Sequence, residues 1–372
     1  MTKILSSDIL IIDANVKLSE NPEMARLAQK YELIPGGKTA LDEAQFREFS
    51  AALAGHLVTL TPGGSAANTL TTLSKLGQGS IKADFIGVTG KSSYSQMIKD
   101  GLDEAKVRLI PEEIHGEPRP ESAVSFVLIY PDGQRTIATY PGNAKDVLKP
   151  DLISDDMVSG ADVVFVQGSL WQKMGEKFPD RLMDLRWQHG KELWLAMPTH
   201  AKFGEEKADL FQWLIPSANV VLSNEEELAR IYKTTPEHAL ERLQQIFQSK
   251  RSSQRLEDIA KQQVGFVTRG EKGAAVVTRE GITLIDPVAI HPDDIKNTVG
   301  AGDTAFAGFL FGHLKGLAPE VSAQIAMRLA SEKLKINQAR LPSPENTLQA
   351  TMPALYSQLQ SAGREMPAGI SK

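Results

Sequence analysis

Cysteine is absent from the 372 residues, which excludes disulfide bonds. Long apolar runs are also absent. The stretch Ile9 to Ile12 is flanked by Asp8 and Asp13, and it is too short for a signal peptide or for the ~20 residues of a membrane span. These absences predict a cytoplasmic protein with no membrane partner.

No strong excess of either charge occurs, because 41 basic residues stand against 46 acidic ones and give a net charge of −5. A nucleic-acid partner is therefore not expected. The segment Gly90-Lys91-Ser92 lacks the P-loop glycine five positions earlier, where Phe85 stands. No strand is followed by G-x-G-x-x-G, and the seven histidines form no zinc motif. P-loop, dinucleotide-binding and zinc chemistry are thus disfavoured.

Short apolar runs alternate with helix-length patterns along most of the chain. This alternation predicts an α/β fold with a mostly parallel central sheet and helices on both faces. The expected strands are 8–13, 82–88, 161–168, 192–197 and 219–224, and the expected helices are 65–76, 93–105, 172–189 and 225–232.

Two segments interrupt the alternation, and we expect them to form a small β-sheet lid from 14–60 and 108–140. Turns are predicted at Pro35-Gly36-Gly37 and at Pro131-Asp132-Gly133, the latter inside a hairpin. The large α/β nucleotide-binding and catalytic domain would then comprise 1–13, 61–107 and 141–372. The last dozen residues are expected to fray.

The most informative motif is NTVGAGDTAFAG at 297–308. Gly300 and Gly302 allow backbone N–H groups to approach an anion at a helix start, while Asp303 falls in the first helical turn. A carboxylate there can accept a proton from a hydroxyl that attacks a phosphate. The alternative is an ordinary loop with a carboxylate favoured by the helix dipole.

A second glycine pair, Gly63-Gly64, precedes a helical pattern that contains Asn68. Together with GQRTIATYPG, SNEEE, TRGEKG and GAGD in this order, it resembles the PfkB (ribokinase) family of carbohydrate and nucleoside kinases, and most closely the adenosine-kinase branch. The resemblance covers most of the chain. It implies a ribokinase-like fold and transfer of the γ-phosphoryl group of ATP to a primary hydroxyl of a nucleoside or sugar.

The resemblance also implies roles for individual residues. Asp303 would be the base, and Gly300, Ala301 and Gly302 would form the anion hole. Asn224 and Glu227 would order Mg²⁺, although an N-cap asparagine followed by glutamates also begins ordinary solvated helices. Nucleotide contacts would come from Asn224, Thr268, Gly270 and Gly273. Arg135 would reach the transferred phosphate, unless it is only an exposed strand cation.

The acceptor would be bound by Gly63, Gly64, Asn68, Asn15 and Asp13. Trp171 would stack on a nucleoside base, unless it only packs in the core. Relatives carry a carboxylate where Lys17 stands, so either Lys17 faces a phosphorylated sugar or it points to solvent while Asp13 binds the hydroxyls.

A further departure concerns the ions. Asn297 replaces an aspartate that helps relatives to form a monovalent-cation site, so the need for such a cation is open. A non-catalytic sensor of nucleotide or sugar is the alternative from another functional class. The quaternary structure is expected to be a monomer or a homodimer.

Overall fold

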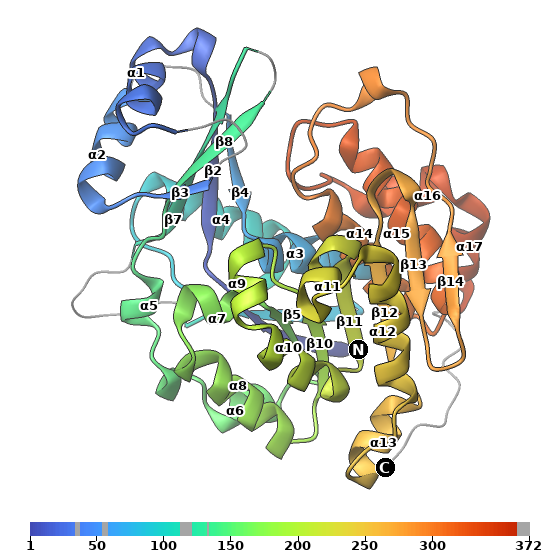
Figure 1. Ribbon diagram of the computed structural model, residues 1–372. Helices are drawn as coiled ribbons and strands as arrows, with labels where there is room; N and C mark the ends of the chain where they lie inside the picture. The colour runs from blue at the N-terminus through green and yellow to red at the C-terminus, as the bar shows by residue number, and fades with distance from the viewer. Residues whose placement is uncertain (34–37, 54–58, 112–120, 132–133, 363–372) are drawn as a thin grey trace. The chain divides into compact units, whose positions relative to one another are not determined.

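The computed structural model describes residues 1–33, 38–53, 59–111, 121–131 and 134–362. The chain divides into two units, with Met1, Asn68–Lys82 and Glu192–Lys372 in unit 1 and Thr2–Ala67 and Ala83–Lys191 in unit 2. Helix α3 (Ser65–Gly77) begins in unit 2 and continues in unit 1. Figure 1 labels most of the helices and strands of both units.

Unit 1 contains strands in the order β14-β13-β12-β11-β10. Strands β10, β11 and β12 run parallel, whereas β13 and β14 continue the sheet as antiparallel hairpins. Apolar side chains are buried along β10 to β13, which fits strands covered on both faces, whereas Leu284 of β14 is exposed. The strands are β10 (Glu192–Ala196), β11 (Val220–Asn224), β12 (Val264–Thr268), β13 (Ala274–Val277) and β14 (Ile282–Ile285).

Two neighbouring residues of β12 show that helices cover both faces of this sheet. The ring of Phe266 stacks on Phe309 of α14, with centroids 4.6 Å apart. A Cβ on Gly265 would lie 2.7 Å from Leu243 of α12, so glycine leaves the room that this helix needs. Because successive strand residues point to opposite faces, α14 and α12 lie on opposite sides. The longer helices are α11 (Glu225–Tyr232), α12 (Pro236–Gln248), α14 (Ala301–Leu314), α15 (Pro319–Leu334), α16 (Pro344–Thr351) and α17 (Pro353–Ala362), and the shorter ones are α9 (Ala201–Glu206), α10 (Ala208–Leu214) and α13 (Gln254–Ala260).

Unit 2 contains four further strands in the order β9-β1-β5-β6, in which β1 pairs with β9 and β5 pairs with β6 in parallel. Short helices connect them. The elements are β1 (Thr2–Ser7), β5 (Ile81–Ile86), β6 (Val107–Ile110), β9 (Val163–Gln167), α4 (Ser93–Glu104), α5 (Ala144–Val147), α6 (Asp155–Ser159), α7 (Ser169–Met174) and α8 (Lys177–Gln188).

A second, smaller sheet in unit 2 has the order β3-β8-β7-β2-β4. One of its faces packs against α1 and α2, which lie beside it in Figure 1, and Phe49 of α2 contacts Phe126 of β7 in this buried cluster. The opposite face carries polar side chains. The elements are β2 (Ile11–Lys17), β3 (Lys38–Ala40), β4 (Thr59–Gly63), β7 (Ala123–Ile129), β8 (Arg135–Tyr140), α1 (Pro22–Lys30) and α2 (Glu43–Ala52).

The predicted α/β class is confirmed, with mostly parallel main-sheet strands, covering helices and a second small sheet. Two element predictions were wrong. The strand expected at 8–13 begins only at Ile11, because residues 8–10 connect β1 to β2. In this connection the carboxylate of Asp8 accepts bonds from the N–H of Ile9 at 2.8 Å and from Lys173 Nζ at 2.7 Å. The single helix expected at 172–189 is interrupted at Gly175, whose φ of 74° no helix accommodates.

The predicted lid boundaries, 14–60 and 108–140, stay a prediction. The predicted turn at 35–37, most of that at 131–133 and the end of the chain from 363 onwards lie outside the described residues. Within the described part of the chain, no helix has the length and apolarity needed to span a bilayer.

Candidate active site

The start of α14 has the geometry of an anion-binding turn. Gly300 caps the helix in the left-handed conformation, with φ 79°, and a Cβ there would lie 1.9 Å from the carbonyl oxygen of Ala339. Gly302 is exposed, and a Cβ on it would meet nothing within 4 Å. First-turn N–H groups have no partner within their own helix, so this end of α14 can accept an anion beside Gly302.

The predicted base, Asp303, is held by side chains far away in sequence. Asn68 Nδ2 of α3 donates to Asp303 Oδ2 at 2.8 Å, and Asn68 Oδ1 accepts from Arg340 Nε at 2.7 Å. A carboxylate can only accept and a guanidinium can only donate, so the two partners fix which way the Asn68 amide faces. The glycine-rich loop, the early helix and the carboxylate therefore meet in unit 1. The roles of Asp303 and Asn68 stay predictions.

Asn224 and Glu227 form a reciprocal capping box at the start of α11. Asn224 Oδ1 accepts from the Glu227 N–H at 2.7 Å, and Glu227 Oε2 accepts from the Asn224 N–H at 3.0 Å. Burial raises the pKa of Glu227 to about 7, against the opposing effects of the Asn224 N–H and Arg230, and the negative charge of Asp303 adds to the rise. Asn224 and Glu227 therefore cap a helix, as the alternative interpretation of the sequence predicted. Glu227 is nevertheless buried, whereas the side chains of an ordinary solvated helix start are exposed.

These residues suit a magnesium ion that is held mainly through phosphate and water oxygens. Among the described residues, no group of three or more His, Asp or Glu side chains could hold a metal ion alone. Mg²⁺ commonly uses one or two carboxylates together with waters and substrate phosphates. One buried carboxylate whose pKa is raised, beside an amide, fits this mode because a nearby cation would favour its ionised form.

The predicted nucleotide turn lies next to the capping box. Thr268 at the end of β12 is in register with Asn224 at the end of β11. Arg269 Nε donates to Glu225 Oε2 at 3.1 Å and ties the turn to α11. Gly273 has φ 87°, and a Cβ on it would lie 2.1 Å from the Ile285 carbonyl oxygen, while a Cβ on Gly270 would meet nothing within 4 Å. The carboxyl ends of parallel strands are the usual ligand-binding edge of α/β sheets.

In unit 2, the acceptor residues gather on β2 and β4. A Cβ on Gly63 would lie 2.4 Å from Asp13 Oδ2, so only glycine leaves room for this carboxylate. Gly64, with φ 93°, begins α3. Asn15 Nδ2 donates weakly to the Thr59 carbonyl at 3.4 Å.

Lys17 lies two positions beyond Asn15 on the same sheet face, at the exposed end of β2, and it forms an ion pair with Glu20 at 2.9 Å. Of the two sequence alternatives, this arrangement agrees with Lys17 in solvent and Asp13 beside the glycine pair.

Two other predicted residues also belong to unit 2. Arg135 opens β8 opposite Ile129, which in turn pairs with Lys17, so it shares the face of the small sheet that carries Asp13. Trp171 is buried in α7, and its Nε1 donates to Asp180 at 2.9 Å. This burial agrees with the packing alternative, and a contact with a base stays a prediction.

The loop before Gly300 does not suit an added monovalent cation. The ammonium of Lys333, a fully buried side chain, donates to the Asn297 carbonyl oxygen at 2.7 Å. A cation at this carbonyl would have to displace or repel the ammonium. Whether the protein needs a monovalent cation stays open at this point.

Sequence reasoning did not find Arg340 or Lys333. Each is an ordinary basic residue at or beyond the end of α15, and no local pattern marks it. Their importance comes from partners 272 and 36 positions away, Asn68 and Asn297.

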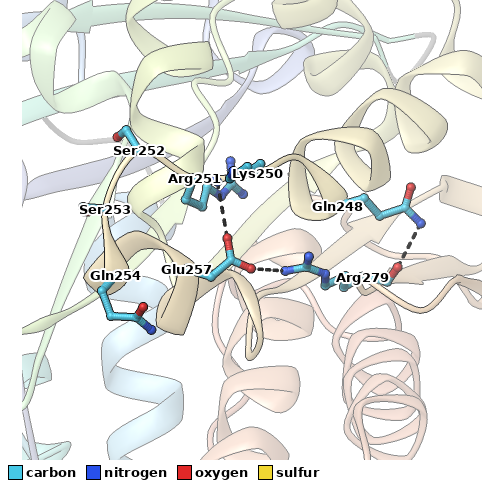
Figure 2. Close-up of a pocket in the computed structure, with 8 residues that line it drawn as sticks. All are labelled: Gln248, Lys250, Arg251, Ser252, Ser253, Gln254, Glu257 and Arg279. Carbon is cyan, nitrogen blue, oxygen red and sulfur yellow. Dashed lines mark hydrogen bonds and ion pairs between the residues drawn. The ribbon is translucent and has the colours of Figure 1, made fainter.

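A surface pocket elsewhere in unit 1 is distinct from these residues. It has a volume of about 450 Å³ and lies between the end of α12, α13 and Arg279. Figure 2 shows Glu257 between Arg251 and Arg279, and it accepts from Arg279 Nη1 at 2.8 Å and from the Arg251 N–H at 3.3 Å. The pocket is lined by none of the residues that the motifs single out, so it is not part of the candidate site.

Comparisons with known proteins agree with this geometry. The sequence profile of the pfkB family carbohydrate kinases matches residues 42–346. Adenosine kinase of Schizosaccharomyces pombe is 24% identical over 274 residues, which are 70% of this chain and 76% of that protein. 5-Dehydro-2-deoxygluconokinase of Geobacillus thermodenitrificans is 23% identical over 264 residues, or 68% and 72% of the two chains.

Among solved structures, adenosine kinase from Sinorhizobium meliloti has a TM-score of 0.76 at 20% identity, and the match covers 94% of this chain and 99% of that one. This likeness confirms the ribokinase-like fold. Since the family profile spans most of the sequence, the prediction of an alcohol phosphotransferase is confirmed. The chain belongs to the pfkB family of carbohydrate kinases.

Proposed function

We propose that this protein transfers the γ-phosphoryl group of Mg²⁺-bound ATP to a primary hydroxyl of a nucleoside or, as the second choice, a sugar. The observation that carries the proposal is the bond of Asn68 to Asp303 at the glycine-rich start of α14. This bond joins two family signatures that are 235 positions apart. One supplies the amide of Asn68, and the other supplies both the carboxylate of Asp303 and the anion-binding turn.

In this mechanism Asp303 accepts the proton of the acceptor hydroxyl as the oxygen attacks the γ-phosphorus. Asn68 orients the carboxylate by donating to its Oδ2. The N–H groups at the start of α14 stabilise the negative charge of the phosphoryl group during its transfer. Glu227 and Asn224 would hold a magnesium ion beside the phosphates, and the ion would supply neutralisation of phosphate charge.

For the acceptor, Asp13 accepts hydrogen bonds from neighbouring hydroxyl groups while Gly63 permits close approach. The name of the Schizosaccharomyces pombe relative supports a nucleoside as the first choice. The solvent-exposed ion pair of Lys17 with Glu20 gives no support to a phosphorylated sugar.

The test is an ATP-consumption screen over nucleosides, sugars and phosphorylated sugars, with the Asp303→Asn variant beside the wild type. A base contributes about 10²- to 10⁴-fold, so we expect the variant to fold and bind ATP but to turn over at least ~100-fold more slowly. Near-normal turnover of the variant would refute the role of Asp303. Tight ATP binding by the wild type without turnover of any acceptor would instead favour the non-catalytic sensor.

A further inference from the structure

Lys333 is a buried cation that the proposed reaction does not use. It lies in the last turn of α15, its side chain has 0% exposure, and its Nζ donates to the Asn297 carbonyl oxygen at 2.7 Å. Burying an ammonium is unfavourable unless hydrogen bonds compensate for the lost water. An apolar side chain would avoid that penalty. We therefore ask which part of the structure the ammonium stabilises.

The ammonium stabilises the loop that leads into the anion-binding turn. Besides the ammonium bond, Asn297 Nδ2 donates to the Asn337 carbonyl at 2.5 Å, and Asn297 Oδ1 accepts from the Val299 N–H at 2.9 Å. The next residue, Gly300, lies directly against the Ala339 carbonyl. Residues 297–300 are therefore attached on one side to 333–339 and continue on the other side into α14.

We propose that Lys333 is a positioning residue whose ammonium serves as a built-in cation for the loop 297–300 and makes the protein independent of added monovalent cations. The proposal rests on the proposed function, because that loop places Gly300, Gly302 and Asp303. It also explains the amide at 297. A carboxylate there would pair with a mobile cation, whereas a neutral amide leaves the Asn297 carbonyl to the fixed ammonium.

The first experiment compares cations on the wild-type protein. Turnover and melting temperature are measured in KCl, NaCl and tetramethylammonium chloride at equal ionic strength. We expect the same values within error in all three salts, because the lysine already supplies the charge. A specific increase of either quantity in KCl would overturn the proposal.

The second experiment removes the ammonium. Lys333→Met keeps an unbranched side chain that is one atom shorter and takes away the ammonium that donates to the Asn297 carbonyl. Lys335→Met removes a more exposed lysine that pairs with Glu332 at 2.8 Å. A misplacement of about 1 Å in a site can lower the rate about 10²-fold, so we expect the kcat of Lys333→Met to fall about 10- to 100-fold. Lys335→Met should retain the wild-type kcat. An unchanged kcat in Lys333→Met would overturn the proposal.

The third experiment restores the charge from solution. Lys333→Ala opens a space at the carbonyl, and ammonium or methylammonium chloride should raise its melting temperature and its kcat relative to tetramethylammonium chloride. The wild type should not respond. A merely structural loss of packing would not be rescued by charge, so the absence of any rescue would overturn the proposal. If the wild type consumes no ATP with any acceptor, the proposed function fails, and the melting temperatures still decide the role of Lys333.

Discussion

At the scale of single residues, burial changes the acidity of one carboxylate of the candidate site, that of Glu227. Glu227 is 5% exposed and its pKa is raised to about 7, mainly by burial. A carboxylate whose folded pKa lies above its unfolded value stabilises the fold below the unfolded pKa, and this contribution is lost as the pH rises through the folded pKa. The protein without ligands should therefore lose stability between about pH 4.5 and pH 7.

Glu227→Gln removes this dependence because an amide stays neutral. We expect the variant to be more stable than the wild type at pH 8 by up to about 3 kcal/mol, with the difference shrinking towards pH 5. Its Mg²⁺-dependent ATP binding should be weaker. Denaturation at several pH values measures the first effect and calorimetry the second.

Glu226→Gln is the matched control, since that side chain is 77% exposed. Stability curves of Glu227→Gln and the wild type that run parallel from pH 5 to pH 8 would contradict the assignment.

Two residue-scale features were beyond prediction from the sequence. The motifs identified Asp303 and Asn68 but not the guanidinium that fixes the Asn68 amide, because Arg340 is brought there only by the path of the chain after α15. Asn297 was recognised as a departure from the family, yet its consequence depends on a lysine of another helix.

At the scale of elements, the N-terminus of α14 depends on two glycines for different reasons. A methyl group on Gly300 would collide with the Ala339 carbonyl in a left-handed backbone conformation, whereas one on Gly302 would project into open space. Gly300→Ala should lower the melting temperature and the activity together.

Gly302→Ala should melt at or above the wild-type temperature, because alanine favours a helix over glycine by about 0.5–1 kcal/mol. Its turnover should nevertheless fall, because the methyl group obstructs the approach of phosphate. Thermal melts and steady-state kinetics of both variants check this, with Gly281→Ala, at another open position, as the control. Full activity in Gly302→Ala would show that phosphate does not approach there.

The elements themselves were largely predictable where pattern and burial agree. Continuous apolar runs such as Val163–Val166 became β9, and the 225–232 pattern became α11. The prediction failed for residues 8–10, which are not part of a strand. Asp8 there accepts a hydrogen bond from Lys173, a residue 165 positions away. Local periodicity contains no information about such a partner.

At the scale of the whole molecule, the residues proposed for the two substrates belong to different units. The nucleotide and metal residues Asn224, Glu227 and Thr268 lie in unit 1, and the acceptor residues Asp13 and Gly63 lie in unit 2. A substitution in unit 2 should therefore change binding of the acceptor without changing binding of ATP.

Asp13→Asn should raise the KM for the acceptor about tenfold or more, since a hydrogen bond to a charged group contributes about 1.5–3 kcal/mol. ATP binding, measured by calorimetry without acceptor, should stay as in the wild type. Lys17→Met is the control on the same strand and should change neither quantity, because Lys17 is 62% exposed and pairs with the equally exposed side chain of Glu20. The reverse result, a high acceptor KM in Lys17→Met alone, would point to an anionic acceptor.

The amide of Asn68 has a consequence for how this centre could change by a single substitution. With aspartate at position 68, two carboxylates would face each other across one hydrogen bond, and they would have to share a proton. Arg340 would then stabilise the negative charge on the new residue, so the shared proton would reside mainly on Asp303 and block it as a base. If Asp303 is the base, this one-atom exchange would move the activity of the variant towards alkaline pH.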